Sequence, residues 1–275
     1  MVVVAACQIP AAMGSNDHGH LDAAVREAAA RGARLVVLPE LAVCGYAFDT
    51  AAEARAAAQT VAGPTVTLLR ALSRELGVVL VCGFAESGAD GEVYNAAVLV
   101  EDGGVRSLYR KAHLWGREPE FFRAGDGPPV VVDTAVGRVA VLICYDLEFP
   151  EWTRLAALAG ADVLAVPANW PLLARPAGER AIEVVKAQAA AGTNRVHVVV
   201  ADRCGEERGV QWIGGSLVCA DTGYLLAGPA TAAGTPSAPV VLTAELDPAS
   251  ARDKSLGPHN DALHDRRPEL YHPPT

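Results

Sequence analysis

Apolar residues along the first third of the chain gather in short runs separated by segments of mixed character. Runs rich in β-branched residues over 2–9 and 34–38 flank a segment, about 21–30, with a helical pattern. A second helix is predicted over about 65–76 and a further strand over 78–83. Strand, helix and strand joined by short links indicate parallel strands connected by crossing helices.

The pattern changes in the middle of the chain. Two apolar-rich runs, 93–101 and 105–110, flank Asp102-Gly-Gly, which predicts a hairpin. A second pair follows over 130–133 and 138–144. Two strand pairs in succession indicate antiparallel additions to a sheet.

In the second half of the chain, helices and strands alternate again. We expect helices over 151–159 and 179–191. The expected strands are 163–166, 196–201, 212–219 and 240–245. A single sheet of so many strands would be unusually wide. Two sheets packed face to face, with helices on the outer faces, accommodate them. The sequence contains no repeat, so we expect an α/β fold in one domain over 1–275. The tail from about 252, rich in Pro, His and charge, is expected to be extended and available to a partner.

Composition excludes several classes of function. Half of the 275 residues are hydrophobic, and the net charge of −9 disfavours nucleic acid and anionic membrane surfaces as partners. The apolar start, Met1–Ile9, has no basic residue before it and is too short for a membrane span. We expect a cytoplasmic protein with a small-molecule substrate.

The six cysteines fit that expectation. Their spacing gives neither a CxxC pair nor a Cys/His zinc pattern, so no metal and no cofactor is predicted. Most lie in apolar runs, as buried reduced thiols do. They are residues 7, 44, 82, 144, 204 and 219.

Three chemically useful side chains follow predicted buried strands. Glu40 comes after an apolar run ending in Pro39, Lys111 after the second strand of a hairpin, and Cys144 after Val139–Ile143. Strand ends that open into loops are where α/β sheets place their sites. These residues are therefore candidates for a common site.

The sequence around each of the three resembles a motif of the nitrilase superfamily of carbon–nitrogen hydrolases. The motifs are LPELAVCGY (38–46), YRKAHL (109–114) and LICYDLEFPE (142–151), in the family's order. The similarity extends from about residue 2 to residue 250. This resemblance implies a four-layer α-β-β-α sandwich that forms homodimers or higher homo-oligomers, and a Glu-Lys-Cys catalytic triad.

The resemblance also implies a role for each residue. Glu40 would take the proton of the Cys144 thiol and later activate the water that hydrolyses a thioester. Lys111 and the backbone N–H of Tyr145 would stabilise the oxyanion. The family's second Glu, followed by Phe and Gly at set spacing, matches Glu118, with Glu120 as the fallback.

Other positions bear on the kind of reaction. Many nitrilases have Trp-Glu directly after the cysteine, whereas this chain has Tyr145-Asp146, which favours amides over nitriles. The family's N-carbamoyl-amino-acid hydrolases have two arginines where Leu147 and Glu148 stand. Glu148 would repel a substrate carboxylate and attract an ammonium or guanidinium, unless its partner is internal. His113 is expected to be a structural hydrogen bonder.

The motifs are most similar to those of bacterial aliphatic amidases, which include 5-aminopentanamidases and R-stereoselective amidases. The expected substrate is thus a small aliphatic primary amide, with an ω-amino or ω-guanidino amide as one option. An N-carbamoyl amine or amino acid hydrolase, or a nitrilase, with the same triad is the alternative. Tyr46, Asn169 and Trp170 are expected to line the pocket, and Asp202 stands where many relatives have Asn.

Overall fold

The computed structural model describes residues 1–11, 13–14, 16, 18–230 and 238–271, which form two six-stranded sheets. The first sheet has the order β14-β1-β2-β3-β4-β5 and is parallel between β1, β2 and β3. Its strands are β14 (Val240–Leu246), β1 (Val2–Gln8), β2 (Leu35–Val37), β3 (Val79–Ser87), β4 (Val93–Glu101) and β5 (Gly104–Arg110).

The second sheet has the order β13-β12-β9-β8-β7-β6, and its centre, β7-β8-β9, is parallel. Its strands are β13 (Leu225–Ala227), β12 (Leu217–Cys219), β9 (His197–Ala201), β8 (Val163–Pro167), β7 (Gly137–Val141) and β6 (Val131–Thr134). Both sheets therefore combine a parallel centre with antiparallel edges, as the two hairpin signals predicted.

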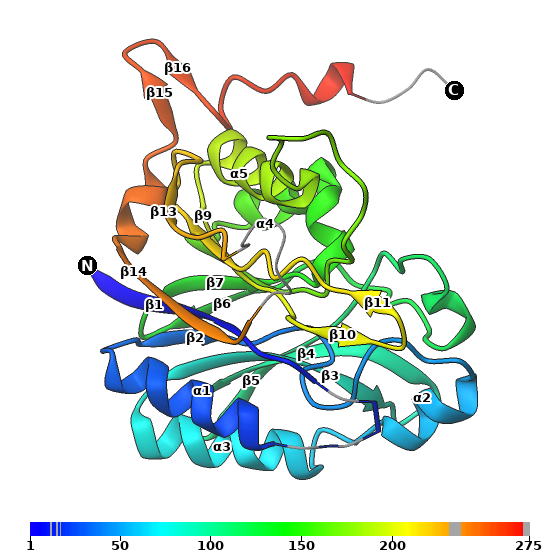
Figure 1. Cartoon of the computed structure of the whole chain (residues 1–275). Helices are drawn as coiled ribbons and strands as arrows, with labels where there is room; N and C mark the ends of the chain where they lie inside the picture. The colour runs from blue at the N-terminus through cyan, green and yellow to red at the C-terminus, as the bar shows by residue number, and fades with distance from the viewer. Residues whose placement is uncertain (12, 15, 17, 231–237, 272–275) are drawn as a thin grey trace.

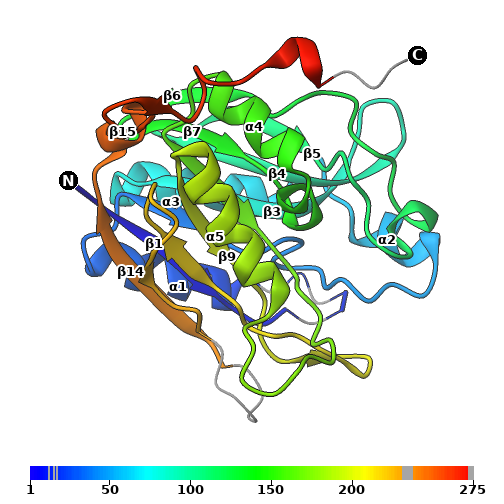
Figure 2. The same ribbon diagram turned by 90° about the horizontal axis from the view of Figure 1, so that it is seen from above.

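Helices cover the outer face of each sheet, so the molecule has four layers (Figure 1; Figure 2 gives the view from above). The helices α1 (Gly19–Ala30) and α3 (Pro64–Leu76) lie against the first sheet, and α4 (Pro150–Leu158) and α5 (Ile182–Asn194) against the second. This arrangement confirms the predicted α-β-β-α sandwich. A short helix, α2 (Ala51–Ala57), was not predicted.

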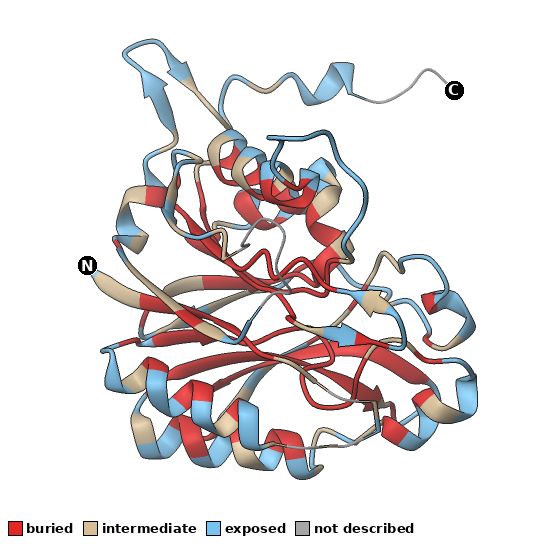
Figure 3. Cartoon of the chain, in the orientation of Figure 1, coloured by how far each residue is buried: buried red, intermediate tan, exposed pale blue. Residues whose placement is uncertain are grey.

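Alternation of side chains across the strands builds two hydrophobic layers from one run of sequence. Val4 and Leu35 join the core that includes the second sheet. Ala5 and Val36, next to them in sequence, point the other way and pack with Leu21 and other apolar residues of α1 and α3. Strands buried on both faces are apolar throughout, which is why these runs could be recognised (Figure 3).

The segment 212–219 differs from the single strand predicted there. Only Leu217–Cys219 forms β12, because the backbone before it leaves the strand conformation at Gly214, where φ is 61°. The N–H of Gly215 donates to the Asp202 carboxylate, 2.7 Å away, in place of a strand partner. This loop faces the site described below.

The tail beyond residue 252 is not extended throughout. A small hairpin, β15 (Ser255–Gly257) with β16 (Asn260–Asp261), lies on the side of α4 and α5, as the red end of the ribbon in Figure 1 shows. Arg154 of α4 donates to the carbonyl of Ala262, which ties the tail to the chain's own helix.

Across the described residues, the longest and most apolar helices still fall short of what a membrane crossing needs.

Candidate active site

The three candidate residues come from both sheets. Glu40 follows β2 and Lys111 follows β5, so both leave the first sheet at the same edge, whereas Cys144 follows β7 of the second sheet. The side chains meet between the sheets: the Cys144 thiol lies close enough to Glu40 and Lys111 for both charges to act on it. Glu40 and Lys111 are fully buried, and Cys144 is 6% exposed.

Lys111 lies at the centre of a buried charge cluster. Its Nζ is 2.7 Å from Oε1 of Glu40 and 2.7 Å from Oε1 of Glu118. One ammonium between two carboxylates leaves a net negative charge in a region closed to water. Such a cluster is costly to bury unless its hydrogen bonds are satisfied.

Asn95, on β4, supplies some of those hydrogen bonds. Its Nδ2 donates to Oε1 of Glu40 at 2.6 Å and lies 3.4 Å from Oε1 of Glu118. Oε2 of Glu40 has no hydrogen-bond partner among the described residues. One oxygen of Glu40 is therefore held in place, and the other is available to accept a proton.

Glu118 is placed by its own loop. Its Oε2 accepts from the backbone N–H of Trp115 at 2.9 Å, while Oε1 contacts Lys111. The returning chain passes so close that a Cβ on Gly125 would lie 2.3 Å from the carbonyl oxygen of Arg110. Glu120, in contrast, is exposed and pairs with Arg117, so the geometry favours Glu118 over Glu120 as the fourth residue of the cluster.

Cys144 occupies a strained turn. Its φ of 47° is in the left-handed region, where residues other than Gly are uncommon, and it begins the 3₁₀ segment Cys144–Glu148. The first N–H groups of such a segment have no partner within it, so the N–H of Tyr145 is a candidate oxyanion donor. The Sγ atom lies 3.8 Å from the carbonyl oxygen of Asn169.

Asp146 fixes this turn against the lysine segment. Its Oδ2 accepts from the Tyr109 hydroxyl at 2.8 Å and from the N–H of Ile143 at 3.1 Å. Its Oδ1 lies 2.7 Å from Nδ1 of His113 and accepts from the backbone N–H of that residue. The structural hydrogen-bonding role predicted for His113 is confirmed. From the sequence, Asp146 was noted only in the Tyr145-Asp146 pair that favours amides; its role in holding the nucleophile turn and the lysine loop together was not predicted.

Burial controls the protonation of the cluster. It raises the pKa of Cys144 well above its usual value, and the Glu40 carboxylate adds to this effect while Lys111 opposes it. Burial also raises the pKa of Glu40 to about 7, although Lys111 and Asn95 lower it. For Lys111, burial lowers the pKa, but Glu118 and Glu40 outweigh burial and hold the pKa well above its usual value. The resting site thus contains a neutral thiol, an ammonium and a carboxyl group that titrates near neutral pH.

The expected pocket residues lie at different depths. Tyr46 is half-buried and lies close enough to Glu118 for the two side chains to interact. Asn169 and Trp170 follow β8 and are almost fully buried, and the Asn169 amide has no hydrogen-bond partner among the described residues. The Asp202 carboxylate accepts from the N–H groups of Trp170 and Arg203 as well as from the 212–219 loop. Asp202 therefore has a structural role, since it holds the segment after β8 and the 212–219 loop together.

Glu148 has an internal partner. Its carboxylate contacts the ammonium of Lys186, on α5, and only 16% of its side chain is exposed. The cation that the sequence suggested for the substrate is therefore supplied by the chain itself, which removes the basis for a cationic substrate at this position. The sequence did not identify this partner because it does not show that α5 packs on the 3₁₀ segment that contains Glu148.

A cavity of about 320 Å³ opens beside the charge cluster. Tyr46, Trp115, Arg117 and Glu118 are among the residues that line it. Tyr145, Asn169 and Trp170 do not line this cavity, although the Tyr145 ring packs edge-on against Trp115. In the part of the chain that the structure describes, no three His, Cys, Asp or Glu side chains gather in a way that could hold a metal ion.

A buried thiol beside a carboxyl group and an ammonium defines a cysteine-dependent hydrolase. The chain belongs to the carbon–nitrogen hydrolase family, whose model matches residues 3–254. It is 41% identical over 249 residues to a nitrilase of Pyrococcus abyssi, covering 90% of this chain and 89% of the relative. An (R)-stereoselective amidase of Pseudomonas sp. is 35% identical, with 70% and 67% covered.

Solved structures agree. An amidase from Nesterenkonia sp. AN1 superimposes with a TM-score of 0.78 at 28% identity, covering 98% of each chain. These comparisons confirm the resemblance to the aliphatic amidase branch of the nitrilase superfamily. The protein is an enzyme of the amidase type.

Proposed function

We propose that this enzyme hydrolyses a small aliphatic primary amide to a carboxylic acid and ammonia through a thioester on Cys144. The observation that supports this best is the contact of Lys111 with both Glu40 and Glu118 beside a buried thiol. Papain-like cysteine hydrolases use a histidine as base. Here a carboxyl group is the base, and an ammonium is available for the developing oxyanion.

The chemistry follows from these positions. Glu40 accepts the Cys144 proton as sulfur attacks the amide carbon, and the oxyanion receives hydrogen bonds from Lys111 and the Tyr145 N–H. The proton on Glu40 passes to the leaving nitrogen, the C–N bond breaks and ammonia departs. Water then attacks the thioester, giving its proton to Glu40, and the C–S bond breaks to release the acid and restore the thiol. Glu118 keeps Lys111 in place throughout.

The structural neighbours support a nucleophilic active-site cysteine. In a Glu-to-Gln mutant of the Nesterenkonia amidase, the acetamide moiety of fluoroacetamide has been found covalently added at the active-site cysteine. Variants of that amidase have been solved in complex with acrylamide and with butyramide. Small amides of this kind are therefore the first substrates to test.

Carbamoyl compounds and nitriles are the alternative substrates. Proteins of Arabidopsis thaliana and Solanum tuberosum that are 30% identical to this chain are named N-carbamoylputrescine amidases. A panel of butyramide, N-carbamoylputrescine and butyronitrile distinguishes the three reactions. Ammonia with CO2 from the carbamoyl compound, at a higher kcat/KM than ammonia from butyramide, would reject the amidase proposal.

The pH profile of the enzyme tests the base. Because kcat/KM reports the free enzyme, it should rise with pH through about 7, the value to which burial raises the pKa of Glu40. Below this value Glu40 is protonated and cannot accept the thiol proton. Steady-state rates from about pH 5 to 9 measure this.

Asp202 provides the control, because burial raises its pKa to about 7 as well. The rise should persist in Asp202→Asn, since that carboxylate only accepts backbone N–H groups. A profile that is flat through about pH 7, or a rise that disappears in Asp202→Asn, would count against Glu40 as the base.

We further propose that the enzyme is a cytoplasmic homodimer. The support is indirect: all six cysteines are free and buried, and apolar side chains such as Leu155, Leu158, Ile182 and Val185 are exposed on α4 and α5. Analytical ultracentrifugation that gives the 28.5 kDa mass of one chain at all concentrations would reject the dimer.

A further inference from the structure

The cavity beside the charge cluster, called here the vestibule, has an aromatic wall. Its ring-bearing residues come from three separate loops and are Tyr46, Phe48, Trp115, Phe121 and Trp212. The volume of about 320 Å³ is large compared with the few heavy atoms of a short amide. The wall therefore offers contact area that a short substrate leaves unused.

The rings pack against one another in fixed orientations. Tyr46 meets Trp212 edge-on, with 5.3 Å between the ring centroids, and Phe48 meets Phe121 at 6.1 Å. Edge-to-face contacts of this kind stabilise aromatic clusters beyond the burial of their area. The wall is accordingly a preformed surface for another flat apolar group.

The vestibule borders the charge cluster at Glu118, whereas Glu40, Lys111 and Cys144 do not line it. Glu118 lines it, and the same carboxylate holds Lys111. Tyr46 lines it too and is close enough to Glu118 and Cys144 to interact with both electrostatically. A substituent on an acyl group bound at Cys144 would have to pass Glu118 and Tyr46 to enter the vestibule.

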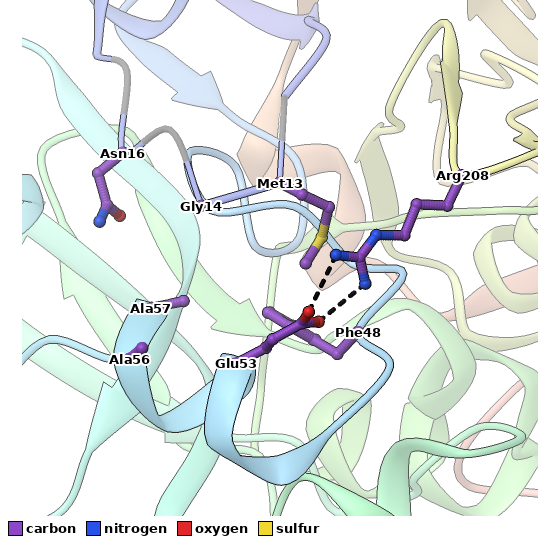
Figure 4. Close-up of a pocket in the computed structure, with 8 residues that line it drawn as sticks. All are labelled: Met13, Gly14, Asn16, Phe48, Glu53, Ala56, Ala57 and Arg208. Atoms are coloured by element: carbon purple, nitrogen blue, oxygen red, sulfur yellow. Dashed lines mark hydrogen bonds and ion pairs between the residues drawn. The ribbon is translucent and has the colours of Figure 1, made fainter.

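Charged groups that line the vestibule are already paired within the chain. Figure 4, which views the neighbouring pocket that shares Phe48 and Arg208 with the vestibule, shows the Arg208 guanidinium facing Glu53. Its Nη1 lies 2.8 Å from Glu53 and 2.8 Å from Asp49.

Arg117, at another part of the wall, donates to Glu120 at 2.8 Å and lies over the Phe121 ring. Glu118 is held by Lys111. A charged substrate group would have to displace one of these partners, whereas an uncharged group displaces none.

We propose that the vestibule is an acyl-group subsite that binds an uncharged aromatic substituent, so that the preferred substrate is a primary amide whose short aliphatic chain ends in an aromatic ring. This proposal rests on the proposed amide hydrolysis. It places the selectivity of the enzyme in the aromatic loops and not in Glu148.

Ammonia release from matched amides tests the subsite. The panel is 3-phenylpropionamide, butyramide, 5-aminopentanamide and 4-carbamoylbutanoate, which share an unbranched chain and differ at its far end. We expect kcat/KM for 3-phenylpropionamide to exceed that of each of the others by roughly tenfold or more, the effect of filling an apolar pocket. Equal or higher values for either charged amide, or for butyramide, would overturn the subsite and leave amide hydrolysis intact.

Release of ammonia from none of the four would instead overturn the proposed function. In that case calorimetry with the Cys144→Ala variant tests the subsite alone. Tighter binding of 3-phenylpropionamide than of 5-aminopentanamide would support it, and no difference would reject it.

A variant pair locates the effect. Trp115→Ala removes part of the wall but keeps the backbone N–H that donates to Glu118, and the Trp115 side chain is 39% exposed, so folding should survive. We expect the ratio of kcat/KM for 3-phenylpropionamide to that for butyramide to fall by about tenfold, and Trp115→Phe to restore part of it. The control is Tyr224→Ala, an exposed aromatic residue between β12 and β13, which should leave the ratio unchanged. An unchanged ratio in Trp115→Ala would refute the assignment.

Discussion

Cys144→Ala is expected to lower kcat/KM for butyramide by about 10⁵-fold or more, because no other group can form the thioester. Only the sulfur atom is lost, and the backbone strain at the positive φ of this position is similar for Ala and Cys. The folded structure should therefore persist, with a melting temperature within a few degrees of the wild type. Ammonia assays and thermal melts measure the two effects.

Cys219→Ala is the matched control for this variant. Cys219 is a free, fully buried thiol on β12, and it takes no part in the charge cluster. It should keep most of the activity. Acid-quenched mass spectrometry should detect an acyl adduct in the wild type and in Cys219→Ala, but not in Cys144→Ala. Turnover retained without Cys144 would end the thioester mechanism.

Lys111→Met should affect both activity and stability. Removal of the ammonium leaves two buried carboxylates on the same Asn95 amide without a counter-charge. Breaking a buried ion pair in this way costs about 3–5 kcal/mol of the free energy of unfolding. Loss of an oxyanion donor should also lower kcat by about 10²–10³-fold. Denaturant titrations and steady-state kinetics give both quantities.

The pH dependence of stability and a second substitution, Glu118→Gln, separate the loss of stability in Lys111→Met from its loss of activity. In Lys111→Met the charge of Glu118 raises the pKa of Glu40 without an opposing ammonium, so the folded protein binds more protons than the unfolded one. Stability of the variant should then fall as pH rises from about 5 to 8. Lys111→Met combined with Glu118→Gln should regain stability without regaining activity. A single variant as stable as the wild type at the higher pH would show that Lys111 does not neutralise this cluster.

The strands and helices of the four layers could be predicted because each is indicated by the residues within it. Buried strands such as Val2–Gln8 are apolar on both faces, and the hairpin at Asp102-Gly-Gly carries its own turn residues. Glu40, Lys111 and Cys144 could be found for a related reason, since each directly follows such a strand. Their motifs added the family and the expected roles.

The residues that the sequence did not reveal depend on distant contacts. Asn95 is an isolated polar residue within a strand, and only the sheet register brings it to Glu40, 55 positions away. The partner of Glu148 is a lysine 38 residues further along the chain. Trp115 and Trp212 lie in loops without periodicity, and their shared cavity depends on how those loops fold. Local patterns carry no information about such pairs.

The division of the reacting groups between two sheets has a consequence for how the enzyme fails. Glu40 and Lys111 are attached to one sheet and Cys144 to the other, so sulfur and base stay in register through the packed interior between the sheets and the hydrogen bonds of Asp146. Mild denaturant or heat that lets one sheet slide by about an ångström should stop turnover while circular dichroism still reports intact strands and helices. Inactivation would then precede melting, and a fragment containing either sheet alone would be inert even when folded.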